Sequence, residues 1–241
     1  MDRGMINRKI IPLFLLISIT GTLLVSCGNS EELERLHRVN ADLRSQNRDM
    51  QQEITSFQHN MEKLETIEQQ LNFLANQMQD VKAQIITNQG DIELEFLPDL
   101  APIHVFNFVT RAESGYYDRT KFHRVIPGFM IQAGDPNSRG DNRRSYGSGG
   151  PLVSIPHEFN QTAHEPGVLS MARVADKQAG AGSQFFIMHG RNPGLDGEYT
   201  AFGRVTQGMD VVNSIASTDI SSEYRDQPAD DVVIEQIRVF R

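Results

Sequence analysis

Residues 122–135 have the sequence FHRVIPGFMIQAGD, which contains parts of two short apolar runs, 121–126 and 129–133. Four more apolar runs follow toward the C-terminus, at 168–172, 184–189, 200–205 and 232–240. Glycine-rich turns separate these runs from one another. Short strands with frequent turns predict a mainly β domain, built either as a closed barrel or as a sandwich.

The segment before this stretch predicts a hairpin followed by a helix. Lys82–Thr87 and residues 92–97 are β-prone runs, and the Gly90-Asp91 pair between them indicates a hairpin turn. Pro102 suits the first turn of a helix that ends near Gly115. The apolar face of this helix is expected to carry Val105, Phe106, Phe108 and Val109.

Residues 122–135 resemble the signature sequence of the cyclophilins, a family of peptidyl-prolyl cis-trans isomerases. Supporting blocks follow in the expected order: GVLSMAR at 167–173, GSQFFI at 182–187, LDG at 195–197 and FGRV at 202–205. The resemblance covers roughly residues 82–241, so we place the isomerase domain at 81–241. It implies an eight-stranded closed antiparallel barrel capped by two helices, the second of them at 208–216.

The resemblance also implies a reaction that needs no cofactor and no metal. Isomerisation twists the Xaa-Pro amide over a barrier of about 18–20 kcal/mol without breaking a bond. The twisted nitrogen gains a lone pair, which a fixed cation or hydrogen-bond donor stabilises. Arg124 matches the arginine that lies beside the prolyl amide in the family and is expected to be catalytic. An isolated arginine would instead suggest a surface ion pair.

The other residues carried over from the family are expected to bind substrate. The residues implied to form an apolar pocket for the proline ring are Phe129, Met130, Phe186 and Leu195. The residues implied to hold the peptide around it are Gln132, Ala172, Arg173, Gln184 and Tyr199. Tyr199 stands where many members have His, and Gly194 stands where many eukaryotic members have Trp. Without the resemblance, the apolar positions would be taken as ordinary core, and His123 is interpreted as structural.

Composition excludes several other functions. The chain has 31 acidic and 23 basic residues, a formal net charge of −8, which argues against nucleic acid as a partner. A single cysteine excludes an internal disulfide framework. The seven histidines show no zinc-ligand spacing with cysteine, and residues 147–150 lack the Lys-Ser/Thr ending of a phosphate loop.

The loop at 137–150 carries three arginines, Arg139, Arg143 and Arg144, against Asp141. It is either a rim that recruits acidic client segments or a solvated glycine-rich loop.

The N-terminus resembles a bacterial lipoprotein leader. Arg3, Arg8 and Lys9 precede an apolar run, which ends in LVSC at residues 24–27. This predicts a signal peptide at 1–26, acylation of Cys27 and a short tether at 27–30. Gly28 in place of Asp favours the outer membrane of a bacterial envelope. An ordinary signal peptide with a chance cysteine, or an uncleaved anchor, is the alternative.

Residues 31–80 are expected to form a helical stalk, because none of the 19 Gly or 10 Pro lies in residues 29–89. Apolar residues with 3/4 spacing predict a coiled coil. They are Leu33, Leu36, Leu43, Met50, Ile54, Phe57, Met61 and Leu64. Asn40 and Asn47 at a positions favour a dimer. Near Leu64 the phase shifts by three residues, and the seam continues to Met78.

The sequence as a whole predicts a lipid-anchored isomerase that assists the folding of exported proteins by acting on their proline-containing segments. The stalk is expected to hold it away from the membrane and to make it a homodimer. Three alternatives remain open. The domain could bind proline-containing segments without turnover, the stalk could be the functional part as an envelope tether, or the helix could be monomeric and folded against the following domain.

Overall fold

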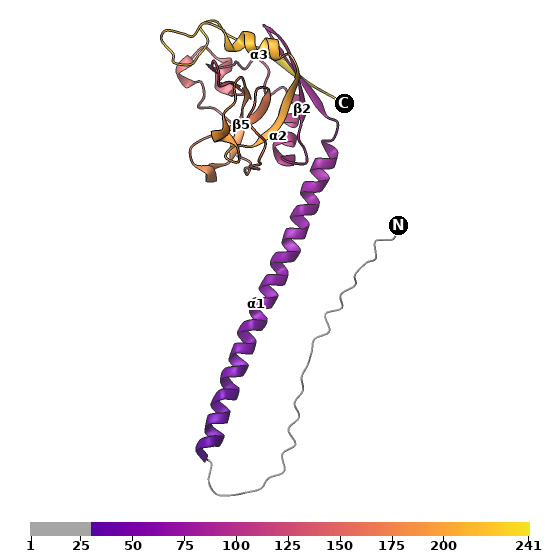
Figure 1. Ribbon diagram of the computed structural model, residues 1–241, viewed down its shortest axis with the longest axis vertical. Helices are drawn as coiled ribbons and strands as arrows, with labels where there is room; N and C mark the ends of the chain where they lie inside the picture. Colours follow the sequence, from indigo (N-terminus) through magenta and orange to yellow (C-terminus); the bar gives the residue numbers. More distant parts are fainter. Residues whose placement is uncertain (1–29) are drawn as a thin grey trace. The chain divides into compact units, whose positions relative to one another are not determined.

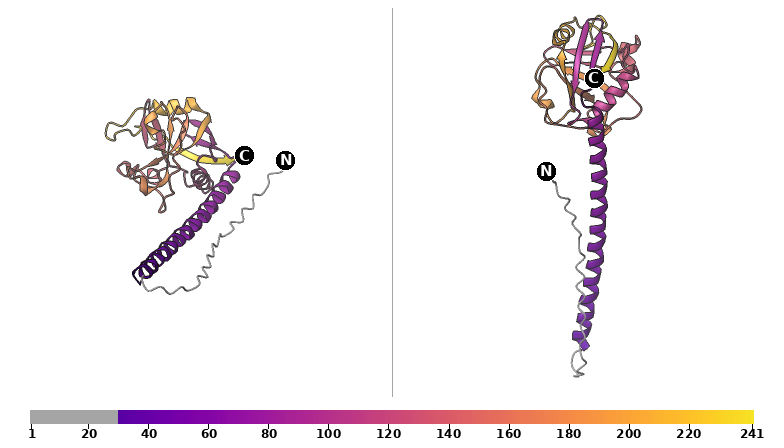
Figure 2. Two further views of the ribbon diagram at one scale, coloured as in Figure 1. Left: turned by 60° about the horizontal axis from the view of Figure 1, so that its bottom comes forward. Right: turned by 90° about the vertical axis from the view of Figure 1, so that its right-hand side faces the viewer.

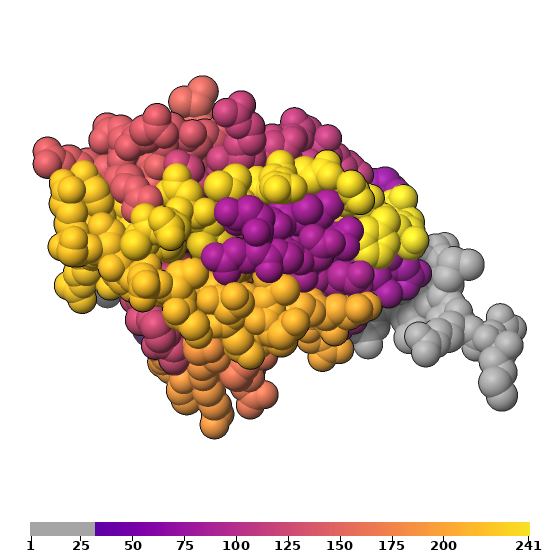
Figure 3. Space-filling view, turned by 90° about the horizontal axis from the view of Figure 1, so that it is seen from above, coloured from indigo at the N-terminus to yellow at the C-terminus, as the bar shows by residue number. Residues whose placement is uncertain are grey.

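The computed structural model describes residues 30–241, and eight strands of this part form one antiparallel sheet (Figure 1). The strands are β1 (Lys82–Thr87), β2 (Gly90–Phe96), β3 (Arg124–Ile126), β4 (Met130–Ala133), β5 (Val168–Arg173), β6 (Ala181–Met188), β7 (Ala201–Gln207) and β8 (Ile234–Phe240). They pair in the order β3-β4-β6-β5-β7-β2-β1-β8. Figure 3 shows the β1–β2 hairpin, in purple, between the C-terminal segment in yellow and the orange segment that follows residue 200.

The two end strands of this sheet, β3 and β8, meet just outside their regular ladders. Lys121 and Val233 form an antiparallel bridge, and the Phe122 N–H donates to the Val232 carbonyl at 2.9 Å. These contacts close the sheet on itself. The predicted mainly β, eight-stranded antiparallel barrel is therefore confirmed.

Two helices pack on the barrel, at the places that the sequence indicated. Helix α2 (Pro102–Glu113) contacts β6, β7 and β8, and α3 (Met209–Ala216) contacts β2, β3 and β4. The ring of Phe108 on α2 lies 5.1–5.6 Å from four other aromatic rings, and these are Phe96, Tyr117, Phe185 and Phe202. Single 3-10 turns lie at Pro136–Arg139, Arg143–Ser145, Lys177–Ala179 and Pro193–Leu195. The core thus fills the barrel and is sealed by both helices.

The hairpin turn lies two residues earlier than the Gly90-Asp91 pair that the sequence suggested. Thr87 pairs with Gly90, so Asn88 and Gln89 form the turn. The Thr87 hydroxyl closes it by accepting from the Gln89 N–H at 3.0 Å and donating to the Gly90 carbonyl at 2.6 Å. Gly90, with φ +127°, begins β2, where a Cβ would lie 2.8 Å from Val211 on α3. Gly90 is therefore needed for close packing against α3 beside the turn, and not for the turn itself.

Helix α1 (Ser30–Gln77) is the long N-terminal helix that the sequence predicted. The apolar side chains of the predicted seam are exposed in the single chain, and they are Leu33, Leu36, Leu43, Met50, Ile54, Phe57, Met61 and Leu64. None of the helices in the described part of the chain has both the length and the apolar content needed to cross a bilayer.

The end of α1 belongs to the same compact unit as the barrel, residues Asn60–Arg241. Met78, just after the helix, is only 8% exposed and lies in the barrel's main hydrophobic cluster. The C-terminus is beside this junction, where Arg241 donates to the Gln77 carbonyl at 3.4 Å (Figure 2). Met78, predicted as the last residue of an intermolecular seam, is therefore a core residue of its own domain.

Candidate active site

A cavity of about 370 Å³ opens on the barrel surface beside β3 and β4. Nine of the ten residues that the sequence assigned to the site line it. They are Arg124, Phe129, Met130, Gln132, Ala172, Arg173, Phe186, Leu195 and Tyr199. The tenth, Gln184, lines an adjoining groove that also contacts Gln132, Ala172 and Arg173. The structure thus brings residues from four strands, one 3-10 turn and two irregular positions, Phe129 and Tyr199, into a single site.

The registers of three neighbouring strands align the central side chains of this site. Arg124 on β3 lies opposite Gln132 on β4, and Gln132 lies opposite Phe186 on β6. Directly opposed residues on antiparallel strands have side chains on the same face. A cation, an amide and an aromatic ring therefore stand in one row across the sheet.

A chain of hydrogen bonds ties the Arg124 guanidinium to the neighbouring loop. Arg124 Nη1 donates to Gln132 Oε1 at 3.3 Å, and Gln132 Nε2 donates to Gln184 Oε1 at 2.9 Å. Gln184 Nε2 in turn donates to the carbonyls of Gly147 and Gly149 at 2.9 and 2.8 Å. The Arg124 side chain nevertheless remains 43% exposed, so its charge is accessible from the cavity.

The apolar residues of the site form a cluster separate from the main barrel core. Its buried members are Met130, Val168, Phe186, Met188, Leu195 and Ala201, with Ile126, Phe129, Ala172 and Tyr199 packed against them. The rings of Phe186 and Tyr199 meet edge to face, 5.7 Å apart. The cavity therefore has an apolar floor, which suits an aliphatic ring, beside a fixed cation.

Comparison with known proteins identifies the architecture to which this site belongs. The family described as cyclophilin-type peptidyl-prolyl cis-trans isomerase/CLD matches residues 82–239. The chain belongs to this family. Its domain is therefore a peptidyl-prolyl cis-trans isomerase, as the sequence predicted.

Bacterial relatives match the cyclophilin domain over most of their own length. Peptidyl-prolyl cis-trans isomerase B of Bacillus subtilis is 41% identical over 143 residues, which are 58% of this chain and 94% of the relative. An isomerase of Synechococcus elongatus is 44% identical over 140 residues, or 57% and 90% of the two chains. By contrast, the isomerase cyp15 of Rhizopus delemar is matched over only 25% of its length, at 40% identity over 68% of this chain.

A solved structure agrees with the barrel. A cyclophilin of Cryptosporidium parvum, crystallised in the presence of the dipeptide Ala-Pro, superposes with a TM-score of 0.60 at 33% identity. The match covers 66% of this chain and 99% of that one. α1 lies outside the region that the family matches.

A strand irregularity in the cyclophilin domain lies next to the cavity. The β5–β6 register shifts between Met171 and Arg173, and Ala172 has no ladder partner among the described residues. Between these two pairs β5 has one residue and β6 has three, so the extra residues of the irregularity lie on β6, opposite Ala172. The side chain of Arg173 is held elsewhere, since its Nε donates to the Glu198 carbonyl and its guanidinium lies 4.5 Å from the Tyr199 ring centroid.

Two histidines of the cyclophilin domain lie close to the site. His123 lines the cavity but is only 4% exposed, and burial lowers the pKa of its imidazole. His164 stacks near Phe186 and bonds to Asp196 and Ser170, both at 3.1 Å. Burial also lowers the pKa of His164, although the Asp196 hydrogen bond opposes this. Both imidazoles are therefore favoured in the neutral form.

The sequence did not single out five residues that complete the cavity wall, which are Tyr146, Gly147, Arg225, Asp226 and Gln227. Tyr146 and Gly147 belong to the 137–150 loop, whereas the other three lie in an irregular segment that no sequence pattern marks. Asp226 is the one closest to the chemistry, with Oδ2 3.7 Å from Arg124 Nε.

The loop at 137–150 uses two of its three arginines for internal contacts. Arg139 donates to the carbonyls of Asp118 and Tyr116, and Arg143 donates to those of Pro228 and Ala229. Arg144, 80% exposed, lies 3.9 Å from Glu223. Arg139 and Arg144 are both exposed, and Arg144 is the one without hydrogen bonds to backbone carbonyls among the described residues. In the described residues, no cluster of three metal-ligating side chains is present.

Proposed function

We propose that Arg124 is the electrophile of the isomerase reaction. Rotation about Xaa-Pro destroys amide resonance, and the nitrogen becomes pyramidal with a free lone pair. A site accelerates this step only if it binds the twisted amide better than either planar form. A guanidinium is always charged and presents donors in a rigid plane, so it can meet that lone pair without a proton transfer.

The observation that carries this proposal is the position of Arg124 at the edge of the apolar floor, opposite Gln132 and in one row with Phe186. A proline ring on the floor formed by Met130, Phe186 and Leu195 would bring its nitrogen beside the guanidinium. The backbone of Ala172, which has no ladder partner among the described residues, could pair with the residue before proline. Family membership favours turnover over mere binding, and the Ala-Pro dipeptide used with the Cryptosporidium relative supports proline-containing peptides as substrates.

Kinetics on the full chain, purified in detergent, test this role. Arg124→Ala is expected to lower kcat/KM for a short Xaa-Pro peptide by roughly 10²–10³-fold, as for other single electrostatic donors. Arg204→Ala, which removes an exposed arginine from β7, is the matched control. Full activity in Arg124→Ala would overturn the assignment. Peptide binding with negligible turnover in the wild type would favour the binding-module alternative.

We further propose that the enzyme works in a bacterial envelope, anchored by lipid on Cys27 after removal of residues 1–26. These residues and the 27–30 tether lie largely outside the described part of the chain, so the leader pattern in the sequence is the support. Two or three acyl chains give lasting anchorage. Anchorage would concentrate the isomerase near exported proteins.

A fractionation experiment separates the anchoring alternatives. In a bacterial host, the wild type is expected in the outer-membrane fraction with the mass of a cleaved, acylated chain. Cys27→Ser is expected to lose the acyl mass and leave that fraction. An unmodified Cys27 in the mature chain would contradict lipidation, and recovery with the inner membrane would contradict the outer-membrane placement.

The stalk is proposed to pair two copies of the chain through the exposed seam from Leu33 to Leu64. Phe57 on this seam is 68% exposed in the single chain. Pairing of two helices would remove such apolar side chains from water, which favours a dimer. Asn40 and Asn47 at a positions would set the register of a dimer. Analytical ultracentrifugation of the full chain in detergent is expected to give a dimer. A monomer would overturn the pairing, and so would a dimer that persists in Leu43→Glu/Phe57→Glu.

The envelope-tether alternative makes a different prediction. If the isomerase is the functional part, Arg124→Ala abolishes the cellular role while deletion of 31–80 weakens it. If the stalk is the functional part, the opposite order is observed.

A further inference from the structure

The backbone at Asp226 is shaped to bring this residue to Arg124. Asp226 has φ +61°, one of three non-glycine residues with positive φ in the described chain. Such a conformation is costly for most residues but is tolerated by Asp and Asn. In this conformation the Asp226 carbonyl accepts from the Val125 N–H at 2.7 Å. The turn is thus attached to the strand residue directly after Arg124.

The carboxylate of Asp226 and the amide of Gln132 engage different parts of one guanidinium. Asp226 Oδ2 lies 3.7 Å from Nε, while Nη1 donates to Gln132 Oε1 at 3.3 Å. The Nη1 contact has hydrogen-bond geometry and is directional, whereas the 3.7 Å contact at Nε is an ion pair, so together they restrict where the guanidinium lies. The remaining nitrogen, Nη2, has no partner among the described residues.

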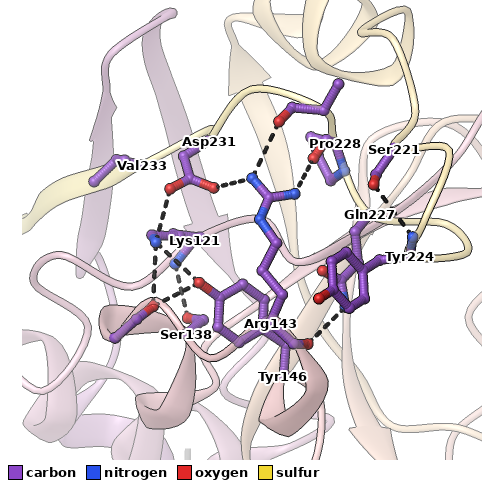
Figure 4. A network of polar contacts seen from close by, with 12 residues as sticks. Lys121, Ser138, Arg143, Tyr146, Ser221, Tyr224, Gln227, Pro228, Asp231 and Val233 are labelled. Carbon is purple, nitrogen blue, oxygen red and sulfur yellow. Dashed lines mark hydrogen bonds and ion pairs between the residues drawn. The ribbon is translucent and has the colours of Figure 1, made fainter.

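A set of polar contacts holds the segment directly after Asp226, and we name it the Arg143 clamp. Figure 4 shows most of these contacts. The clamp consists of Lys121, Arg143, Gln227, Pro228, Ala229 and Asp231. Arg143 donates to the Pro228 and Ala229 carbonyls at 2.6 and 3.1 Å and pairs with Asp231 at 2.6 Å.

Two further contacts complete this clamp. Gln227 Nε2 donates back to the Arg143 carbonyl at 3.0 Å, directly beside Asp226. The nearly buried Lys121 pairs with the other oxygen of Asp231 at 2.8 Å. The turn carrying Asp226 is therefore fastened both to the 137–150 loop and to the strand region before Arg124.

We propose that Asp226 is a positioning residue for Arg124 and that the Arg143 clamp holds Asp226 in place. This inference rests on the proposed function of Arg124 as the electrophile. An arginine has many rotamers, and an electrophile contributes most when its geometry is fixed before substrate arrives. The Asp226 carboxylate also offsets part of the positive charge of Arg124. This charge effect, taken alone, would slow the reaction. Because both side chains are partly exposed, solvent screens this charge effect, and we expect positioning to dominate.

The choice of variant separates the carboxylate from the backbone strain. Asp226→Gly removes the side chain, yet glycine adopts φ +61° without strain. Asp226→Asn keeps a short polar side chain that tolerates the same φ. Asp230→Ala removes an exposed carboxylate four positions along the same segment and is the matched control. Each variant is measured as the full chain in detergent with one Xaa-Pro peptide.

We expect Asp226→Gly to lower kcat about threefold to fivefold with little change in KM. Asp226→Asn is expected to recover most of the loss, and Asp230→Ala to match the wild type. Adding Asp226→Gly to Arg124→Ala is expected to cause no further loss, because the effect passes through Arg124. Unchanged kcat in Asp226→Gly, or a full additional loss in the double variant, would overturn the inference.

The clamp has its own test. Arg143→Lys keeps the charge but cannot bridge the same carbonyls and carboxylate, so we expect a similar loss of kcat that is absent on an Asp226→Gly background. Arg144→Lys, at the exposed neighbouring arginine, is the control. If the losses of kcat in Arg143→Lys and Asp226→Gly add in the double variant, the clamp does not act through Asp226, and this part of the inference is wrong. Full activity in Arg124→Ala would contradict the proposed role of Arg124 as electrophile. Loss of activity in Arg124→Ala with unchanged kcat in Asp226→Gly would contradict only the positioning role of Asp226.

Discussion

Gln132 lies directly opposite Arg124 on paired strands, and its amide joins the guanidinium on one side to Gln184 on the other. The amide therefore holds the charged group and leaves it exposed toward the cavity. Because Gln184 is bonded to two loop carbonyls, this orientation is shared between the sheet and the loop at 147–149.

Replacing Gln132 tests how much this orientation contributes. Gln132→Ala is expected to lower kcat/KM about tenfold, since a hydrogen bond to a charged group and the proposed contact to substrate backbone are lost together. Gln207→Ala, at an exposed glutamine on β7, is the control. Steady-state kinetics measure kcat/KM for both variants. If Gln132→Ala is as active as Gln207→Ala, Gln132 does not contribute to the orientation of Arg124.

Two phenylalanines of the site are expected to respond differently to truncation. Phe186 is buried, so Phe186→Ala is expected to lower the free energy of unfolding by about 3–5 kcal/mol. Phe129 is only half-buried at the cavity, so Phe129→Ala is expected mainly to raise KM. Urea unfolding and kinetics on the same preparations separate the effects. A large stability loss in Phe129→Ala would show that it is core.

Gly134 at the end of β4 is expected to tolerate no side chain. Its φ is +84°, and a Cβ would lie 2.5 Å from the Ser183 carbonyl. Gly128 has a similar φ of +75° but no atom within 4 Å of that Cβ. Gly128→Ala is therefore expected to cost about 1–2 kcal/mol of stability from backbone strain alone. Gly134→Ala is expected to cost clearly more by thermal unfolding, and equal losses would contradict this packing argument.

Stability is expected to fall in mild acid because of the buried histidines. Burial lowers the pKa of His123 and of His164 in the fold, so the unfolded chain binds protons more readily. Their contribution is complete above the unfolded value of about 6.5 and is lost as the pH falls below it. Backbone and side-chain hydrogen bonds from His164 lower the pKa of Asp196, which extends the loss to more acidic pH.

Urea unfolding at pH 7.5 and pH 5.5 measures this dependence. His164→Gln is expected to flatten it, whereas His59→Gln, at an exposed position on α1, is expected to leave it unchanged. An identical pH slope in wild type and His164→Gln would assign the effect to other groups.

The site could be predicted where its residues belong to one contiguous motif. Arg124, Phe129, Met130 and Gln132 lie within nine residues of each other, on two strands that pair locally and on the turn that joins them. Phe186 and Leu195 come from distant blocks, and only the family resemblance connected them. Asp226 could not be found in this way, because a long-range backbone bond to Val125 brings it to the site.

The errors in the sequence interpretation have physical causes. Glycine marks turns, so the sequence predicts a turn at Gly90, but this glycine relieves contact with Val211. The spacing of Met78 predicts a place in the coiled-coil seam, yet the same apolar side chain packs in the barrel core. Periodicity identifies an apolar face and does not identify what covers it.

The burial of Met78 has a practical consequence for dissecting this chain. The family match begins at residue 82, whereas the hydrophobic cluster of the barrel already includes Met78, the residue directly after α1. A truncation that starts at the first strand would therefore leave a vacant site in that cluster. A minimal expression fragment should therefore begin inside α1, upstream of Ala75, so that the buried side chains of Ala75 and Met78 remain packed against the barrel.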